Sequence, residues 1–595
     1  MICKMRRGQL CPKAGYCASG LRLAVLLPVA ACVLVLLAAC QTRRIRLTPE
    51  QEKVRAQLGA IHPKGDSLAA NTRIVDVHTH TFNARYLPLR NILLGKRDVF
   101  PPVSWLISDP CAKTLGQALS DRTELAAAAG QPGKARSMKR GHQYDRGVVC
   151  GILLGLLDKA ADAGCWDKGM PHMEQMKRLD AVADRMTFQE RLAVRAAGHM
   201  MGMDESLKTP DQKGALRGLV RFIWMLTQND AEMGKLFRAE YAGAPMRGSP
   251  LMVSHTMDLA PVYDQKPDGS ALLDFASQQV KRAEAFQKRP DSGMVYFVAY
   301  NPYRDHWMGE KPGDALGVVR SAVEEHGAWG VKVYPPSGYR PADNSIKQRA
   351  QALLSIWPGK EWDARYVGLG ANRNMELNRR LEELLLWCIK ADVPVFVHCG
   401  TGEFEARKGY GLYHSNPHYW RRFLETHPSP DGSPCRLRLC LGHAGGDDFW
   451  FGGGKYASWG QEVYDLCREF PNVYCEITTH NALLDPDRQA YFAAHLIELF
   501  EDTAQRSNQK DSYPYRYAFS KKLLYGTDWY LPDAGERRDV LMATEQAFLH
   551  EKLRSHYGDY FNANALRFLD VRARLKDSRH PVPPAVRDRL ERALD

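Results

Sequence analysis

Short apolar runs recur along this chain from residue 73 to residue 528, and helical patterns lie between several of them. Most of these runs are continuous and are bounded by Gly or Pro, which is typical of strands that are buried on both faces of a parallel sheet. The helical spacing of Asn374–Ile389, directly before one run, indicates that strands and helices alternate. This alternation predicts the α/β fold class.

Eight such runs are found. In chain order they are residues 73–80, 250–257, 294–300, 330–334, 393–398, 437–443, 472–478 and 523–528. Eight parallel strands with intervening helices close into a (β/α)8 barrel of the TIM type, which carries its chemistry at the carboxyl ends of the strands. The sequence therefore predicts such a barrel over residues 71–570.

The chain has 595 residues, whereas a bare barrel needs about 250. Most of the excess lies at about 83–249, where helical apolar spacing predicts a packed insertion after strand 1. An insertion there emerges on the catalytic face. We expect a cap that shapes the pocket and limits substrate size, so that deleting it changes substrate preference while metal content persists.

Potential metal ligands end several of these runs. His78 and His80 are two apart on the first strand, so both imidazoles face the same point. His398, His443 and Asp528 end the fifth, sixth and eighth strands. Neutral imidazole and carboxylate are favoured ligands of Zn²⁺ and similar ions, and the pattern predicts a metal site at this end of the barrel.

This order of ligands resembles the amidohydrolase superfamily, and within it the amidohydrolase-related branch that also contains metal-dependent decarboxylases. Val298–Pro302 after strand 3 and Phe561–Leu566 near the C-terminus add to the resemblance, although Asn562 stands where the branch usually has Gly. The resemblance implies that His78, His80, Asp528 and His398 hold one Zn²⁺, with Mn²⁺ or Fe²⁺ as alternatives.

The resemblance also suggests roles at the site. Asp528 would be the general base, with a helix N-cap as the structural alternative. His443 would bind a second ion, polarise the substrate or position water. Lys332, at the end of strand 4, would be a carboxylated bridge between two ions, a residue of a one-metal site without a bridge, or a contact for an anionic substrate.

Polar residues that follow the strand ends are candidates for substrate contacts. Tyr334 shares a face with Lys332, and Arg340 follows in a loop rich in Pro and Gly. We name both as substrate-binding candidates. For these residues, and for His255 within the second strand, an ordinary solvated position is the simpler interpretation.

Three functions fit these patterns. The first is a metal-dependent hydrolase that cleaves an amide, ester or lactone bond of a small molecule. The second is a non-oxidative decarboxylase on the same scaffold, which would need a cation such as Arg340 or Lys332 beside the substrate carboxylate. The third is a catalytically inactive lipoprotein with a binding role. No basic stripe or nucleic-acid module is evident, so a nucleic-acid partner is not expected.

The N-terminal residues predict export. Five basic residues and no acidic ones precede the apolar run Leu23–Leu37, and Leu37–Cys40 resembles a bacterial lipobox. We expect a signal peptide over residues 1–39, lipidation at Cys40, and a membrane anchor in the outer membrane facing the periplasm. Removing those five charges from the formal +13 leaves the mature chain near +8. Residues 40–70 would be a tether and 571–595 a C-terminal tail.

Overall fold

The computed structural model describes most of the predicted barrel. The described residues are 45–81, 148–165, 170–191, 193–194, 212–259, 269–307, 314–342, 344, 371–402, 405, 410–478, 480–507, 517–529, 537–577 and 582–594. The predicted signal peptide, the lipidation site Cys40 and residues 83–147 of the predicted insertion lie outside these residues. Among the described helices, none is long and apolar enough to cross a membrane.

Eight parallel strands lie side by side in the order of the chain. They are β1 (Val75–Thr79), β2 (Leu251–His255), β3 (Met294–Tyr300), β4 (Gly330–Val333), β5 (Val395–His398), β6 (Leu439–Gly442), β7 (Val473–Ile477) and β8 (Leu523–Tyr525). An isolated parallel bridge between Thr79 and Trp529 brings the last strand back to the first. The predicted barrel is confirmed, and each strand lies within its predicted run.

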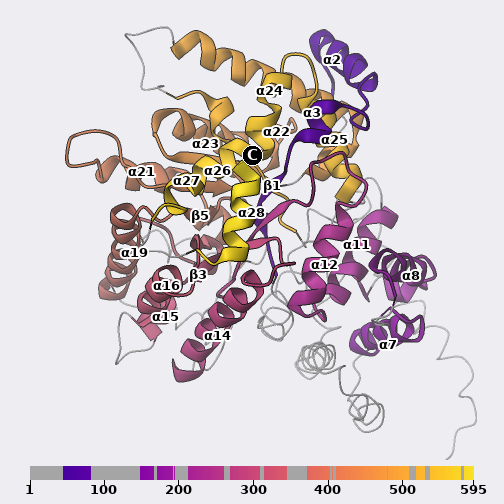
Figure 1. Cartoon of the computed structure of the whole chain (residues 1–595), viewed down its shortest axis with the longest axis horizontal. Helices are drawn as coiled ribbons and strands as arrows, with labels where there is room; N and C mark the ends of the chain where they lie inside the picture. Colours follow the sequence, from indigo (N-terminus) through magenta and orange to yellow (C-terminus); the bar gives the residue numbers. More distant parts are fainter. Residues whose placement is uncertain are drawn as a thin grey trace, which may run out of the picture.

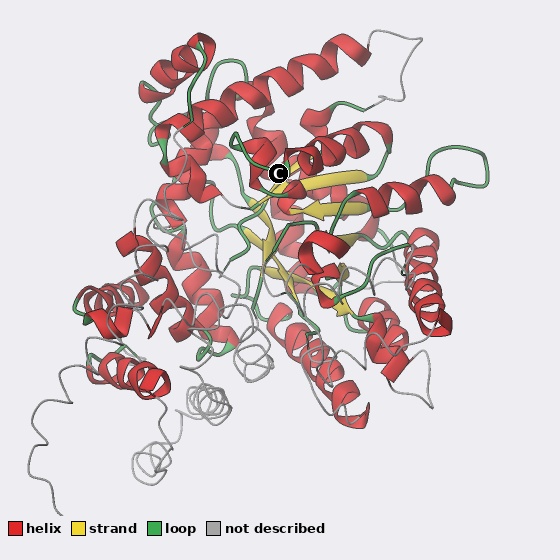
Figure 2. Cartoon of the chain, turned by 180° about the vertical axis from the view of Figure 1, so that it is seen from behind, coloured by secondary structure: helices red, strands yellow, loops and turns green. Residues whose placement is uncertain are grey.

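Helices surround the strands on the outside of the barrel (Figures 1 and 2). Those of the barrel are α14 (Gly269–Gln287), α15 (Pro302–Trp307), α16 (Asp314–Glu324), α19 (Ala371–Ala391), α20 (Tyr410–His414), α21 (His418–Thr426), α22 (Asp447–Trp450), α23 (Ala457–Glu469), α24 (Pro486–Ser507) and α25 (Arg537–Phe548). Short helical turns are η3 (Pro335–Ser337), η4 (His443–Gly445), η5 (His480–Leu484), η6 (Phe519–Lys521), η7 (Arg554–His556) and η8 (Asp559–Ala563).

The insertion after β1 is helical where it is described. Its helices are α7 (Val148–Asp162), α8 (His172–Asp184), α11 (Gln212–Met225) and α12 (Asp230–Glu240), which gather on one side of the barrel (Figure 1). Within the predicted helical insertion, residues 216–242 form parts of two helices, α11 and α12, instead of one continuous helix. The side chain of Asn229 accepts a hydrogen bond from Glu232 N and so caps a new helix, whose first turn is also acidic.

Both ends of the described chain pack on the barrel. In the predicted tether, α2 (Pro49–Gly59) contacts α24, and Val54 and Leu58 are buried; α3 (Ser67–Asn71) follows. At the other end, α26 (Asn564–Phe568), α27 (Val571–Arg574) and α28 (Pro584–Leu594) complete the chain. Leu590 and Val586 of α28 share one apolar cluster with the inward residues of the strands. The segment set apart as a tail thus closes the barrel interior.

Candidate metal centre

Four predicted ligands meet where β1, β6 and β8 end. His78 Nε2 lies 3.3 Å from Asp528 Oδ1, and His80 Nε2 lies 3.0 Å from the same oxygen. Ligand atoms of His78, His443 and Asp528 all lie within 4.8 Å of one another. All four residues are buried. The strand ends therefore bring nitrogen and oxygen donors from three different strands to one point.

His398 and Lys332 complete the cluster predicted from sequence. The His398 ring centroid lies 4.3 Å from that of His443. Lys332 Nζ lies 3.1 Å from His78 Nε2, and also 4.5 Å from the centroid of the Phe396 ring. The amino group of Lys332 thus faces the atom of His78 that also faces Asp528.

The backbone is unusual at two of these positions. Asp528 has φ 52°, His443 has φ 62°, and Ala444 has φ 44°. Left-handed backbone is costly for residues with a side chain, and it persists where the surrounding structure requires it, often at functional sites. Asp528 lies between β8 and the bridging Trp529. The alternative in which Asp528 opens a helix is therefore wrong.

Glu476 of β7 is the main residue that the sequence analysis missed. Its side chain is fully buried, and its Oε2 lies 3.0 Å from His78 Nδ1. The amide of His443 donates to the same oxygen at 3.4 Å. A Cβ at position 526 would lie 2.6 Å from Glu476 Cγ, so Gly526 leaves the space that this side chain occupies. The available signal was an acid inside an otherwise apolar predicted strand.

Other buried partners hold the histidines from behind. His80 Nδ1 lies 3.0 Å from the carbonyl oxygen of His255. Thr478 Oγ1 lies 2.5 Å from His443 Nδ1. His255 itself is fully buried, with its Nε2 2.8 Å from the carbonyl oxygen of Val77. The solvated position considered for His255 is wrong, because β2 directs this side chain into the barrel.

Burial controls the protonation of the cluster. Desolvation lowers the pKa of the His78 and His398 imidazoles well below the usual value, and nearby positive groups add to this. Desolvation also lowers the pKa of His443, to about 4. For Asp528, desolvation raises the pKa, but hydrogen bonding and charge from His80 outweigh it, so the net shift is downward. At neutral pH, three of the histidines are neutral and the aspartate is ionised.

The substrate-binding candidates differ in position. Tyr334 is buried, and its ring centroid lies 4.9 Å from that of His398. Arg340 is also buried, and its guanidinium stacks over the ring of Tyr419 at 4.3 Å. The solvated interpretation is therefore wrong for both. Tyr334 therefore contacts the histidine cluster, whereas Arg340 is stacked on Tyr419.

The donor set fits a divalent ion. Two ligands that each lie about 2.0–2.1 Å from Zn²⁺ are separated by roughly 3.0–3.4 Å, because the ion sits between them. The separations of 3.0 and 3.3 Å to Asp528 Oδ1 are of this size. Neutral imidazoles and an ionised carboxylate are also the protonation states that metal binding needs. His78, His80, His398, His443 and Asp528 are the residues that would hold it.

Comparison with known proteins gives one family and a few distant structures. Residues 306–571 match the family model described as Amidohydrolase. No curated protein sequence matches the chain significantly. A probable 2-pyrone-4,6-dicarboxylic acid hydrolase from Acinetobacter baumannii aligns at 12% identity over 54% of this chain and 83% of its own, with a TM-score of 0.27.

Two solved structures of 2,6-dihydroxybenzoate decarboxylase align in a similar way. One is complexed with 2,6-dihydroxybenzoate and is 13% identical, and the other is from Rhizobium and is 14% identical. Each alignment covers 54% of this chain and 84% of the other, with a TM-score of 0.30. Scores this low carry no argument, so the fold assignment depends on the strand topology described above.

Proposed function

We propose that this chain, whose residues 306–571 match the family model described as Amidohydrolase, is a metal-dependent hydrolase that cleaves an amide, ester or lactone bond of a small molecule. The observation that carries the proposal is the approach of His78 Nε2 and His80 Nε2 to a single oxygen of Asp528 at 3.3 and 3.0 Å. Two buried imidazole nitrogens and a carboxylate oxygen that converge in this way form a donor set suited to a divalent ion.

Each residue has a distinct task in this proposal. A divalent ion bound there supplies Lewis acidity and brings the pKa of a coordinated water towards neutrality. The ionised Asp528 carboxylate accepts the proton of the attacking water and passes it to the leaving group. His443 is neutral, is held by Thr478, and polarises the scissile carbonyl. Glu476 orients His78 by accepting from Nδ1–H, which leaves Nε2 facing the centre.

A decarboxylase is the second candidate, and one observation favours it. Lys332 Nζ lies 3.1 Å from His78 Nε2, so a cation stands inside the cluster where a substrate carboxylate could bind. The two reactions differ in their products. Carbon dioxide release from aromatic acids would support the decarboxylase, and turnover of amide, ester or lactone libraries would support the hydrolase.

Metal content of the purified full chain tests both candidates together. We expect stoichiometric Zn, Mn or Fe, with about one ion for a simple site and about two ions for a carboxylated Lys332. His78→Asn should lose the metal and the activity, because it removes one donor from the centre. His326→Asn is the matched control, since His326 contacts Glu284 away from the cluster. Absence of stoichiometric metal from the wild-type chain would refute both enzymatic candidates.

A further inference from the structure

The barrel closes by a minimal contact between its first and last strands. The seven neighbouring pairs from β1 to β8 are parallel and extend over two or more residues each, and the β1–β2 pair has a register shift between Asp76 and Thr79. The closing seam, defined here as residues 75–80 and 523–529, has the isolated bridge between Thr79 and Trp529 and a hydrogen bond from His80 N to Trp529 O. Three of the candidate ligands lie on this seam, so their separation depends on how it is held.

Helix α12 of the insertion lies along the closing seam. The hydroxyl of Tyr241, at the end of α12, donates to Asp76 Oδ2 of β1 at 2.8 Å. The same hydroxyl lies 3.4 Å from the hydroxyl of Tyr525 in β8. Tyr241 is buried, so water does not replace these contacts readily. One side chain of the insertion thus contacts both strands of the seam.

Asp76 also contacts the chain beside two candidate ligands. The amide and hydroxyl of Thr527 donate to the Asp76 carboxylate at 3.1 and 2.6 Å, directly before Asp528. The amide of His78 donates to Asp76 Oδ1 at 3.2 Å. The carboxylate therefore joins the strand that carries His78 to the segment that carries Asp528, and Tyr241 anchors one of its oxygens.

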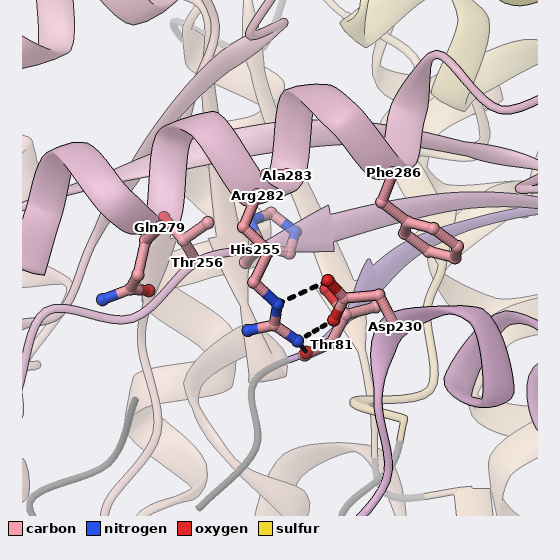
Figure 3. A pocket seen from close by; sticks show the side chains of 8 residues that line it. All are labelled: Thr81, Asp230, His255, Thr256, Gln279, Arg282, Ala283 and Phe286. Atoms are coloured by element: carbon pink, nitrogen blue, oxygen red, sulfur yellow. Dashed lines mark hydrogen bonds and ion pairs between the residues drawn. The ribbon is translucent and has the colours of Figure 1, made fainter. Parts of the chain in front are cut away.

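The rest of α12 is linked to the seam region at two further points, one through Arg282 and one directly. Arg282 of α14 binds the Asp230 carboxylate with two nitrogens and donates to the carbonyl oxygen of Thr81 at 2.6 Å, next to His80 (Figure 3). The ring of Phe237 packs edge-on against Trp529, with centroids 5.2 Å apart. The start, middle and end of α12 are thus each fixed to a residue beside the candidate ligands.

We propose that the insertion is a structural part of the metal centre, and that Tyr241 is a positioning residue which sets the separation between His78 and Asp528. The inference depends on the proposed metal-dependent function, because it concerns the affinity of that centre for its ion. It departs from the expectation that the insertion is only a cap whose loss leaves metal content unchanged. Removal of the α12 contacts should instead weaken metal binding.

The test is the Zn²⁺ affinity of the full-length Tyr241→Phe variant, measured by competition with a chromophoric chelator. Loss of one outer partner of a metal site typically costs 10–100-fold in affinity, and we expect about tenfold because Thr527 still contacts Asp76. Hydrogen–deuterium exchange provides a readout without metal: the peptide that contains His80 should exchange faster in the variant.

Tyr296→Phe is the matched control. Tyr296 is also fully buried, and its hydroxyl donates to the carbonyl oxygen of His326 at 2.9 Å, away from the closing seam. We expect a comparable change in melting temperature and no change in Zn²⁺ affinity. If Tyr241→Phe does not fold, Phe237→Leu carries the same test, since it loosens the contact with Trp529.

Each outcome is decisive. Wild-type affinity in Tyr241→Phe, or an equal loss in Tyr296→Phe, would overturn the inference while leaving the metal-dependent function in place. Failure of the wild-type chain to bind Zn²⁺, Mn²⁺ or Fe²⁺ would overturn the proposed function and this inference with it. A selective loss in Tyr241→Phe together with faster exchange at the seam would support the inference.

Discussion

Glu476 offers a sharp test of how the candidate metal centre is built. The substitution Glu476→Gln keeps the size of the side chain and one acceptor oxygen but removes the ability of the group to ionise. The carboxylate lies 3.0 Å from His78 Nδ1, and burial raises its pKa well above the usual value, with the charge of Asp528 adding to the shift. The raised pKa favours the protonated carboxyl in the metal-free chain, whereas a divalent ion held by His78 Nε2 would favour the ionised form, and that charge would make His78 a stronger donor to the ion.

The expected magnitude follows from these contacts. Outer carboxylates on metal-binding histidines are worth 10–100-fold in metal affinity. Since the amide oxygen of the substituted side chain could still accept from His78 Nδ1, we expect a loss near the lower limit, about tenfold, or about 1.4 kcal/mol at 25 °C. Competition with a chromophoric chelator at constant pH measures this loss, and thermal melting checks that the variant is folded.

Glu545→Gln is the matched control for this substitution. Glu545 is also fully buried with a raised pKa, but its Oε1 accepts from the hydroxyl of Tyr557 at 2.7 Å, rather than contacting a candidate ligand. We expect unchanged metal affinity in this variant. The reasoning is refuted if Glu476→Gln binds Zn²⁺ within twofold of the wild type, or if both substitutions weaken binding equally.

Two further predictions concern stability. Burial raises the pKa of Glu545 to about 8, so the folded chain holds a proton there that the unfolded chain releases near pH 4.5; stability from this group is therefore lost as pH rises from about 4.5 to 8. Glu545→Gln should show a smaller fall in unfolding free energy over this range in denaturant titrations, and an unchanged slope would contradict the assignment. Gly330→Ala would place a Cβ 2.5 Å from the Phe297 ring and from Pro394 O. We expect the variant to be destabilised by about 1–3 kcal/mol, as measured by urea unfolding. A neutral effect would mean that the neighbouring residues move to make room for the added methyl group.

The strands and the candidate ligands at their ends could be predicted from sequence because both depend on local patterns. A fully buried parallel strand needs a continuous apolar run, and β3 matches its predicted run over Met294–Tyr300. The fixed direction of strands in such a barrel then places His398 and Asp528 on the same face, whatever the intervening loops do. This regularity is why five candidate ligand positions could be named without any contact information.

Residues that act through long-range contacts were not predictable in the same way. Asp76 stands only two positions before His78, yet its role depends on Thr527 and Tyr241, which are far away in sequence. Glu476 likewise becomes informative only when β7 is placed beside β6 and β8. An acid in an apolar strand predicts a buried partner, but its identity depends on register across strands that are distant in the chain.

The helical insertion shows a similar limit. Its apolar spacing predicted helices, and α7, α11 and α12 are found where that pattern occurs. The break between α11 and α12 depends on the cap at Asn229, which a continuous apolar pattern conceals. The attachment of α12 to α14 through Arg282 could not be predicted from sequence, because its partner, Asp230, lies 52 positions away.

The closure of the barrel interior by α28 has a consequence for how this chain folds. Val586 and Leu590 complete an apolar cluster that begins with Val75 and Val77 of the first strand. Arg589 of the same helix donates to the carbonyl oxygen of Met294 in β3 at 2.9 Å. During synthesis, the first strands therefore emerge long before α28, the helix that packs against them. The growing chain must pass through stages with an open barrel end, and folding reaches its final cooperative step only after residues 584–594 have been made.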